Sequence, residues 1–464
     1  MCGICGKLNF DPGANIDPGL IPAMLDSIRH RGPDDEGIYS APQVALGHRR
    51  LSIIDLKSGH QPLSNEDGTI WIVFNGEIYN FQELRTFLLS KGHIFKTRTD
   101  TETIVHLYEE FGPACLEKLR GMFAFAIWDD NEKTLFLARD RVGIKPLYYS
   151  LSNQSLVFAS EIKAILSDPG VRREIAPELI DRFLTFLYMP GEETLLKGVK
   201  KLAPGHYLLA KQGRAEVRQY WDLQFSKPPA GRTIEQAHDQ LLDLLAETVE
   251  LHMIADVPVG VLLSGGVDST AVLSFAVERT DKEVSSYTVG FSDPGVADER
   301  PYARLAADTF GTRHSDMTIT PADFMEFMPR YVWHMEEPVC EPPAIAMYYV
   351  SRFARRDVKV LLSGEGGDEA FAGYGNYRNL MWLERMKRGL APLNGAFSRG
   401  LTMADSMFHL PRVRKYAPLI SASFPGYYLS RTSSPFLYSG NGLGKLYTAD
   451  FARSIDRERS IEPV

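Results

Sequence analysis

The fold of the C-terminal half is decided by one stretch of sequence, which reads Val257-Pro258-Val259-Gly260-Val261-Leu262-Leu263-Ser264-Gly265-Gly266-Val267-Asp268-Ser269. Its apolar start, residues 257–263, is typical of a buried strand in a sheet covered on both faces. The Ser-Gly-Gly segment ends that strand. The residues that follow have helical character, with Asp268 or Ser269 as the expected cap. The stretch therefore predicts a strand, a glycine turn and a helix start.

Such a turn suits a phosphate group. A helix N-terminus presents free N–H groups and the positive end of its dipole, and glycines let a phosphate approach the backbone. Asp268 adds a carboxylate where a phosphate-bound Mg²⁺ would lie. The stretch is not G-x-x-x-x-G-K-S/T, and it resembles instead the SGGxDS pyrophosphate loop of enzymes that adenylate a substrate. The alternative is an ordinary strand-to-helix turn with a Ser or Asp cap.

The composition is that of a globular protein without a membrane span or a secretion signal. A chain of 464 residues predicts two or three domains. A net charge of -8 argues against nucleic acid or an anionic membrane as partner. Four cysteines are too few for a disulfide framework, so we expect a cytoplasmic protein with small-molecule partners. The sequence leaves the oligomeric state open, and a homodimer is one option.

Cys2 directly follows the initiator Met1. A small side chain in second position permits removal of that methionine, and the free α-amino group of Cys2 would then act as base for its own thiol. Cys2 is also half of a C-x-x-C with Cys5, but no second pair exists to complete a zinc site. By itself Cys2 is better explained as a buried small residue.

Several ordered motifs in the N-terminal half decide between these interpretations. They are Cys2-Gly3-Ile4, Arg29-His30-Arg31-Gly32-Pro33-Asp34, Arg50-Leu51-Ser52-Ile53-Ile54-Asp55, Asn75-Gly76-Glu77-Ile78-Tyr79-Asn80, Thr99-Asp100 and Arg139-Asp140-Arg141-Val142-Gly143-Ile144-Lys145-Pro146-Leu147-Tyr148-Tyr149. Together they resemble the glutaminase domain of the N-terminal-nucleophile amidotransferases, and most closely the glutamine-hydrolysing asparagine synthetase family. The resemblance implies an αββα sandwich, which agrees with the short strands expected between residues 122 and 160 and the helices expected after Asn80 and Thr99.

The resemblance also implies roles. Cys2 would attack the glutamine amide, and Asn75 with the N–H of Gly76 would form the oxyanion hole. Glutamine would be held by the segment 50–54 and two acidic residues, that is by Arg50, Leu51, Ser52, Ile53, Ile54, Glu77 and Asp100 together with Asn75 and Gly76. A zwitterion needs one cation and one or two anions, which these residue types supply. The alternatives are surface ion pairs and, for Asn75-Gly76, a hairpin turn.

The two halves are expected to meet near residue 225, giving domains 1–225 and 226–464. Residues 226–232 are rich in Pro and Gly, and Thr233 with Gln236 fits a capping box. The following helix is expected to pack Leu241, Leu242, Leu245 and Val249 on a sheet. Beyond it, strand-like and helix-like stretches alternate, which predicts a doubly wound parallel sheet.

A second glycine turn, Ser363-Gly364-Glu365-Gly366-Gly367-Asp368-Glu369, follows the apolar run 358–362. An exposed acidic turn is the alternative to a Mg²⁺-nucleotide site. The segment resembles the ATP-pyrophosphatase-type synthetase domain of the same family. That resemblance implies a pyrophosphate cradle of Ser264, Gly265, Gly266, Asp268 and Ser269, an adenosine pocket of Leu263, Val289, Ser363 and Gly364, Mg²⁺ at Asp268 and Asp368, and Glu365 beside the acyl-adenylate.

The sequence thus predicts an ATP- and Mg²⁺-dependent amidotransferase that adenylates a carboxylate, by resemblance that of aspartate, and amidates it with ammonia from glutamine. Two alternatives remain: another acceptor, such as a peptide, a sugar acid or a secondary metabolite, and a shortened glutaminase or partner-binding protein. The second arises because family members continue well past the acidic glycine motif, whereas this chain stops at Val464. We therefore expect the second domain to be incomplete. Glu336-Glu337-Pro338 is expected to have a structural or substrate-side role.

Overall fold

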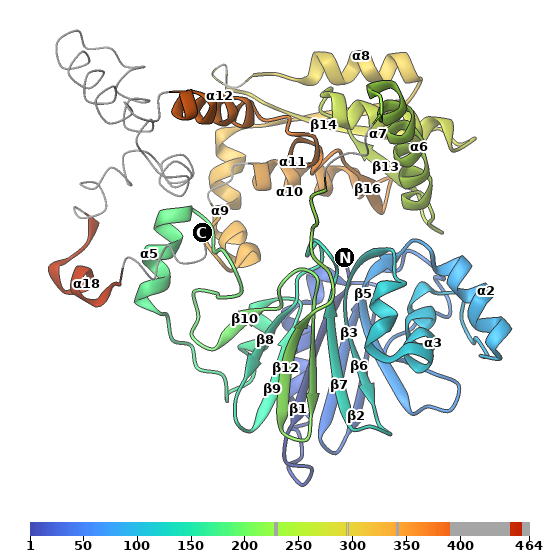
Figure 1. Ribbon diagram of the computed structural model, residues 1–464, viewed down its shortest axis with the longest axis vertical. Coiled ribbons are helices and arrows are strands. Elements are labelled where there is room, and N and C mark those ends of the chain that lie inside the picture. Colours follow the sequence, from blue (N-terminus) through green and yellow to red (C-terminus); the bar gives the residue numbers. More distant parts are fainter. Residues whose placement is uncertain (227–230, 294, 296, 340–342, 390–445, 457–464) are drawn as a thin grey trace. The chain divides into compact units, whose positions relative to one another are not determined.

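The computed structural model describes all of the chain except residues 227–230, 294, 296, 340–342, 390–445 and 457–464 (Figure 1). The chain separates into two compact units. The first comprises residues 1–175, 191–337 and 342–363, and the second comprises residues 176–190, 338–341 and 364–464. Part of the predicted linker and Cys340 lie outside the described residues.

The first unit begins with two antiparallel sheets of six strands each. One has the strand order β10-β8-β9-β1-β3-β2, with strands β1 Gly3–Asn9, β2 Asp35–Ala41, β3 Val44–Arg50, β8 Tyr148–Leu151, β9 Ser155–Ala159 and β10 Val199–Lys201. The other has the order β12-β11-β7-β6-β5-β4, with strands β4 Leu63–Ser64, β5 Ile70–Ile78, β6 Gly121–Asp129, β7 Thr134–Arg139, β11 His206–Lys211 and β12 Arg214–Gln219.

Successive side chains of a strand point to opposite faces of its sheet. In both sheets, the side chains on both faces are mostly apolar. The inner faces pack on each other through residues such as Ile4, Leu46, Ala126 and Trp128. The outer face of the first sheet is covered by helices α1 (Leu20–Ser27) and α4 (Ile162–Ile165). The outer face of the second sheet is covered by α2 (Phe81–Lys91) and α3 (Asp100–Phe111), which lie beside β5 and β6 (Figure 1). The predicted αββα sandwich is confirmed.

The same unit contains a parallel sheet with the order β15-β14-β13-β16. Its strands are β13 Val259–Leu262, β14 Ser285–Phe291, β15 Arg313–Ile319 and β16 Val360–Leu362, and the helices between them are α6 Ile234–His252, α7 Val267–Glu278, α8 Arg300–Phe310, α9 Pro321–Met335 and α10 Pro343–Ala354. Helices α6, α7 and α8 pack on one face of the sheet and α10 packs on the other. The predicted doubly wound parallel sheet is confirmed.

The strand order places a switch point between β13 and β16. The chain proceeds from β13 to β14 and β15 on one side, and β16 then pairs with β13 on the other side. Because both strands are parallel, with Val261 opposite Leu362, the turns that follow them leave the same edge of the sheet. Ligands of open α/β sheets bind in the crevice at such a point.

The second unit is described over four helices. They are α5 Pro177–Phe186, α11 Gly367–Phe371, α12 Gly375–Gly389 and α18 Ala449–Ser454. Within this unit Tyr447 donates a hydrogen bond to Asp181, with 2.6 Å between the oxygens. Two short 3₁₀ turns in the first unit, Arg29–Arg31 and Gly112–Glu117, complete the described elements.

Some local predictions are wrong for physical reasons. The Asn75-Gly76 pair is not a hairpin turn, because it lies inside β5 and pairs with β6. Among the side chains of α6 expected to pack on a sheet, Val249 is buried as predicted, whereas Leu242 is 41% exposed. Helix α10 was not predicted.

The predicted capping box of Thr233 and Gln236 is present. The domain boundary near residue 225 stays a prediction.

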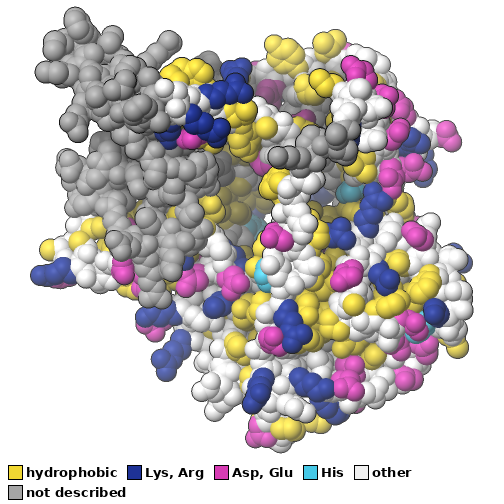
Figure 2. Space-filling model, viewed as in Figure 1, with side chains coloured by type: hydrophobic (Ala, Val, Ile, Leu, Met, Phe, Trp, Pro, Cys, Tyr) yellow, Lys and Arg dark blue, Asp and Glu magenta, His cyan; other side chains and the backbone are white. Residues whose placement is uncertain are grey.

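The surface carries charges of both signs. On the face drawn in Figure 2, the Lys and Arg side chains of the described residues are interspersed with Asp and Glu side chains. Within the described part of the chain, each helix is too short or too polar to cross a membrane.

Candidate functional site

Cys2 lies at the start of β1, against the loop that follows β3. Antiparallel pairing sets Gly3 opposite Arg49, so the loop after Arg50 passes beside the thiol. The N–H of Leu51 donates to Cys2 Sγ over 3.4 Å, and Arg31 Nε donates to the carbonyl of Cys2 over 2.9 Å. The backbone of Leu51 therefore contacts the thiol, and the side chain of Arg31 holds the carbonyl of the same residue.

Burial raises the pKa of the Cys2 thiol, and the hydrogen bond from Leu51 offsets only part of this effect. The thiol is thus held protonated and needs a base to become a nucleophile. Burial also lowers the pKa of the α-amine at the chain start to about 6. This amine belongs to Met1, and it is mostly neutral at pH 7. Cys5 is a buried free thiol.

Arg50 organises the loop 51–55. Its Nη2 atom donates to the carbonyls of Ile54 and Asp55, over 3.0 Å and 2.7 Å. Asp34 holds the same loop from the other side, because its Oδ2 atom accepts from the N–H of Ser52 over 2.9 Å. The predicted segment from Arg50 through Leu51, Ser52, Ile53 and Ile54 is therefore a shaped loop beside Cys2.

Strand β5 carries Asn75, Gly76 and Glu77 in succession. Asn75 is 1% exposed, and its Nδ2 atom has no hydrogen-bond partner among the described residues. Gly76 is required by close packing, because a Cβ atom there would lie 2.3 Å from the carbonyl oxygen of Met122 on β6. A buried N–H₂ group without a partner costs free energy unless a ligand accepts from it.

The half-buried Glu77 and the buried Asp100 form a pair of carboxyl groups. Burial raises the pKa of Glu77 well above its ordinary value, and the charge of Asp100 raises it further. Burial likewise raises the pKa of Asp100, to about 6, although its Oδ2 atom accepts from the N–H of Ile78 over 2.9 Å. Asp100 is positioned at the first residue of α3, where the Thr99 hydroxyl caps the helix. Two carboxyl groups in this state favour a cation between them.

The structure brings together most of the residues predicted for the first site. The charges of Glu77 and Arg50 act on the pKa of Cys2, and the charge of Arg50 acts on Asp100. Lys145 also belongs to this group, because its charge lowers the pKa of Glu77 and its Nζ atom lies 3.3 Å from Met1 Sδ. Sequence reasoning noted the segment 139–149 but assigned Lys145 no role.

A buried ion-pair network behind Cys2 was not predicted. Glu161 accepts from His30 and Arg31, each over 2.9 Å, and pairs with Lys163. Lys163 also pairs with Glu336 over 3.2 Å, and Glu336 accepts from the N–H groups of Ile162 and Lys163 at the start of α4. The predicted structural role of Glu336 agrees with these contacts. Its partners lie about 170 positions away in the sequence, so spacing gave no signal.

A cavity of about 750 Å³ opens beside the chain start. Its lining comes from the N-terminal sandwich and from α9, α10 and β16 of the same unit. Basic side chains dominate it, namely His30, Arg31, Arg330, Arg352, Arg355 and Lys359, with Met1, Asp34, Leu51, Tyr348 and Leu361 among the others. Lys359 Nζ pairs with Asp34 Oδ2 over 2.7 Å.

The predicted phosphate loop follows β13. Gly265 has φ +79°, a conformation that favours glycine, and a Cβ atom there would lie 2.5 Å from the backbone nitrogen of Ala303 on α8. The Oγ atoms of Ser264 and Ser269 lie 3.0 Å apart, which fastens the turn to the first turn of α7. The N-cap is Gly266, so the prediction that Asp268 or Ser269 caps the helix is wrong.

This helix start fits an anion. Gly266 provides no side-chain cap to α7, and the adjoining Val267 is 86% exposed, so first-turn N–H groups face an open surface. Asp268 lies in the same turn and supplies a carboxylate ligand of the type that Mg²⁺ prefers. Beside the turn, Leu263 is buried and donates its N–H to the carbonyl of Tyr287, and Val289 lies further along β14.

The second glycine turn starts at the end of β16. Ser363 is the last residue of the first unit, and Gly364 already belongs to the second unit. Glu365 follows in the second unit, and Asp368 lies in the first turn of α11. The metal-binding role of Asp368 and the acyl-adenylate role of Glu365 stay predictions.

The fold and the two sites define a class: an N-terminal-nucleophile amidotransferase domain followed by an α/β domain of the ATP-pyrophosphatase type. Two sequence-family models match the chain, described as "Glutamine amidotransferase domain" over residues 1–221 and "Asparagine synthase" over residues 240–435. The chain belongs to the glutamine-hydrolysing asparagine synthetase family, as its resemblance to that family predicted.

Curated relatives support this assignment. The chain is 40% identical over 391 residues to asparagine synthetase (glutamine-hydrolyzing) 1 of Bacillus subtilis, a match that covers 84% of this chain and 61% of the relative. A relative from Methanocaldococcus jannaschii, also named as an asparagine synthetase (glutamine-hydrolyzing), is 36% identical, with 82% of this chain and 76% of the relative covered. "Amidase chyE" of Penicillium rubens is 35% identical, with 82% and 60% covered. The chain thus spans about three fifths of the first of these relatives.

Proposed function

We propose that this chain is a glutamine-dependent amidotransferase that adenylates the side-chain carboxylate of aspartate with ATP and amidates it with ammonia from glutamine. The products are asparagine, glutamate, AMP and pyrophosphate. The observation that carries the proposal is the buried group around Cys2, in which a thiol, a guanidinium, two carboxyl groups and an unpartnered amide converge. These are the complements of a glutamine zwitterion and its reacting amide.

In the first site, Arg50 binds the α-carboxylate of glutamine, and Glu77 with Asp100 binds the α-ammonium. The ammonium offsets the burial that raises the pKa of both carboxyl groups and the charge of Asp100 that raises the pKa of Glu77 further. After removal of Met1, the α-amine of Cys2 takes the proton of the thiol, and the thiolate attacks the side-chain amide. Asn75 Nδ2 and the N–H of Gly76 donate to the oxyanion that develops. The tetrahedral intermediate then collapses, the C–N bond breaks, and the protonated α-amine of Cys2 returns its proton to the departing ammonia. Attack of water on the resulting thioester releases glutamate and the free thiol.

In the second site, the turn of Ser264, Gly265 and Gly266 and the start of α7 bind the pyrophosphate part of ATP. Leu263, Val289, Ser363 and Gly364 line the adenosine pocket. Mg²⁺, held by Asp268 and Asp368, would neutralise part of the negative charge of the phosphates. The proposal is supported by the parallel pairing of β13 with β16, because the turns that follow these two strands begin at the same edge of the sheet.

The basic cavity beside Cys2 suits the transfer of ammonia. Ammonia reacts only as the neutral molecule, and nearby cations lower the pKa of ammonium because they disfavour a further positive charge. Arg31, Arg352 and Lys359 supply such cations in the wall of the cavity. We propose that ammonia crosses this cavity in its neutral form.

Replacement of the nucleophile tests the proposal. Cys2→Ala should abolish asparagine formation from glutamine and leave formation from added ammonium salts intact. Intact-mass measurement of the wild-type chain should show loss of Met1. Equal loss of both activities in Cys2→Ala would contradict two separate sites.

A second candidate keeps both sites but changes the acceptor. The relative named as an amidase favours a comparison of several acids. Pyrophosphate release should be measured with aspartate and with a panel of peptide, sugar-acid and secondary-metabolite carboxylates. Greater turnover with another acid would replace aspartate. No ATP–pyrophosphate exchange with any acid would leave a glutaminase or a partner-binding protein.

A further inference from the structure

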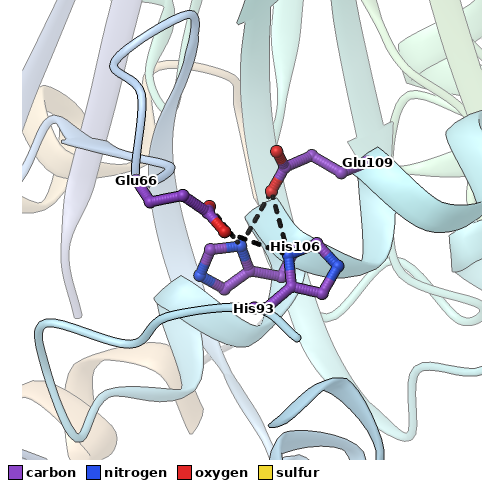
Figure 3. A group of neighbouring side chains, drawn as sticks. All are labelled: Glu66, His93, His106 and Glu109. Carbon is purple, nitrogen blue, oxygen red and sulfur yellow. Dashed lines mark hydrogen bonds and ion pairs between the residues drawn. The ribbon is translucent and has the colours of Figure 1, made fainter. Parts of the chain in front are cut away.

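Four side chains from three separate segments converge on the outer side of α3, away from the residues assigned to glutamine. Glu66 lies in the turn between β4 and β5, and His93 lies in the connection from α2 to α3. His106 and Glu109 are one turn apart on α3. Figure 3 shows both carboxylates directed at the two imidazole rings. One ligand atom from each of the four lies within 4.8 Å of all the others.

The distances are those of groups that face a common point. His106 Nδ1 lies 2.7 Å from Glu109 Oε2 and 3.2 Å from Glu66 Oε2. His93 Nδ1 lies 3.4 Å from Glu66 Oε1 and 3.7 Å from Glu109 Oε2. Each Nδ1 atom therefore faces the same two carboxylates. A single N–H group donates along one direction only. Each Nδ1–H group can therefore donate to one of the two carboxylates that it faces, but not to both.

Two buried atoms of the cluster lack hydrogen bonds among the described residues. Glu66 Oε2 makes none despite its 3.2 Å approach to His106 Nδ1. His106, whose side chain is fully buried, has no hydrogen bond at Nε2, where the nearest carboxylate oxygen, Glu102 Oε1, is 3.9 Å away. Buried polar atoms without a hydrogen-bond partner are rare and need an explanation. An ion bound at the cluster would be the missing partner of Glu66 Oε2.

Outer groups orient the inner four. His93 Nε2 faces Glu110 Oε1 at 3.2 Å, and Glu102 faces His106 from behind. Asn65 Nδ2 donates to Glu109 Oε1 over 2.8 Å, which leaves Glu109 Oε2 free to face the cluster. Carboxylates behind metal-binding histidines fix the ring orientation and raise the basicity of the ligand nitrogen, and they accompany most protein metal sites.

We propose that Glu66, His93, His106 and Glu109 bind one divalent transition-metal ion, with Zn²⁺ as the expected ion. Two imidazole nitrogens and two carboxylate oxygens form a four-ligand set that suits the tetrahedral coordination of Zn²⁺. Imidazole ligands disfavour Mg²⁺ and Ca²⁺, which take oxygen ligands. Because all four positions are supplied by protein, the ion has a structural role.

The ion fastens α3 to the edge of the second sheet. It links the β4–β5 turn and the α2–α3 connection to the middle of the helix. The adjoining Glu102 also accepts from the N–H groups of Lys96 and Thr97, each over 2.7 Å, and so holds the segment that leads into Asp100. Metal binding therefore stabilises the end of α3 that presents Asp100, without contributing a ligand to glutamine.

Direct metal measurement tests the site. The full chain is treated with a chelator, dialysed, and titrated with Zn²⁺ in competition with a chromophoric chelator. We expect one ion per chain, an affinity of micromolar or tighter, and a melting temperature that rises with Zn²⁺ concentration. Excess Mg²⁺ should not compete. Co²⁺ in place of Zn²⁺ should give the visible absorption of a tetrahedral site.

Variants separate the cluster from other zinc-binding groups. His106 is buried, so the main variants are His93→Ala, whose parent side chain is 12% exposed, and Glu66→Gln. Each should weaken Zn²⁺ binding by a factor of roughly 100 or more. His238→Ala, which removes an exposed histidine of α6, is the matched control and should bind as the wild type does. Failure of the wild type to bind Zn²⁺, or wild-type affinity in both variants, would overturn the site. Metal content is read independently of activity, so these outcomes do not depend on the proposed function.

Discussion

Glu161→Gln should destabilise the N-terminal sandwich through charge alone. Burial by itself would raise the pKa of Glu161, but hydrogen bonds and charges from His30, Arg31 and Lys163 outweigh it and lower the pKa from 4.5 to about 2. A difference of about 2.5 units corresponds to about 3 kcal/mol of stability at pH 7. The side chain is only 9% exposed, so little of this is screened by solvent.

The sign of the pH dependence follows from the lowered pKa. The contribution of Glu161 is fully present above pH 4.5 and is lost as the pH falls toward 2, with roughly half remaining near pH 3. Glutamine preserves the size of the side chain, so packing changes little. For a domain of this size the expected fall in melting temperature at pH 7 is roughly 6–12 °C.

Thermal unfolding followed by circular dichroism at pH 7 and pH 3 measures the effect. The matched control is Glu132→Gln, which removes an exposed carboxylate paired with Lys211 on the same sandwich and should leave the melting temperature nearly unchanged. A fall below about 2 °C at pH 7 would refute the charge argument. So would a gap between wild type and variant that stays constant down to pH 3.

Three further substitutions test the sites. Asn75→Ala should lower the kcat of glutamine hydrolysis by roughly 10²–10³ with little change in KM, because it removes an oxyanion donor; an unchanged kcat in a glutaminase assay would exclude that role. Gly265→Ala should lower stability and ATP–pyrophosphate exchange more than Gly311→Ala, because both have positive φ but only the first meets backbone of a neighbouring helix; equal effects in melting and exchange assays would contradict this. Asp100→Asn should raise the melting temperature of the glutamine-free chain at pH 7.5. The pKa of Asp100 is raised from 3.8 to about 6 in the folded chain, so ionisation of its carboxyl group destabilises the fold as the pH rises through this range. The gain should disappear at pH 3.5, and the same variant should bind glutamine poorly; a gain that is independent of pH would point to packing.

Signals that lie close together in the sequence predicted the fold well. Strand β13, the glycine turn and α7 follow one another without a break, so local patterns were sufficient to predict them. The helix cap was misassigned because Asp268 and Ser269 are good capping residues in general, whereas here Gly266 leaves the helix start open. Leu242 was misassigned because periodicity defines a face of α6 but does not say how much of that face a short sheet covers.

Contacts between distant segments could not be predicted from local patterns. Glu161 and Glu336 act through partners on other elements, and no spacing rule joins such positions. The cluster of Glu66, His93, His106 and Glu109 has the same property. Only His106 and Glu109, one helical turn apart, gave a local signal, and a single pair of that kind is too common to define a metal site.

The site proposed for glutamine concentrates unfavourable groups, and this arrangement is itself an argument for its use. Glu77 and Asp100 both have raised pKa values, and Asn75 has a buried amide nitrogen without a hydrogen-bond partner among the described residues. Each of these costs stability in the free protein. An α-ammonium between the carboxyl groups and an oxyanion at the amide would remove both costs at once. The free energy that these groups cost in the free protein would then be recovered when substrate binds and reacts, and this would favour one ligand and its transition state over water.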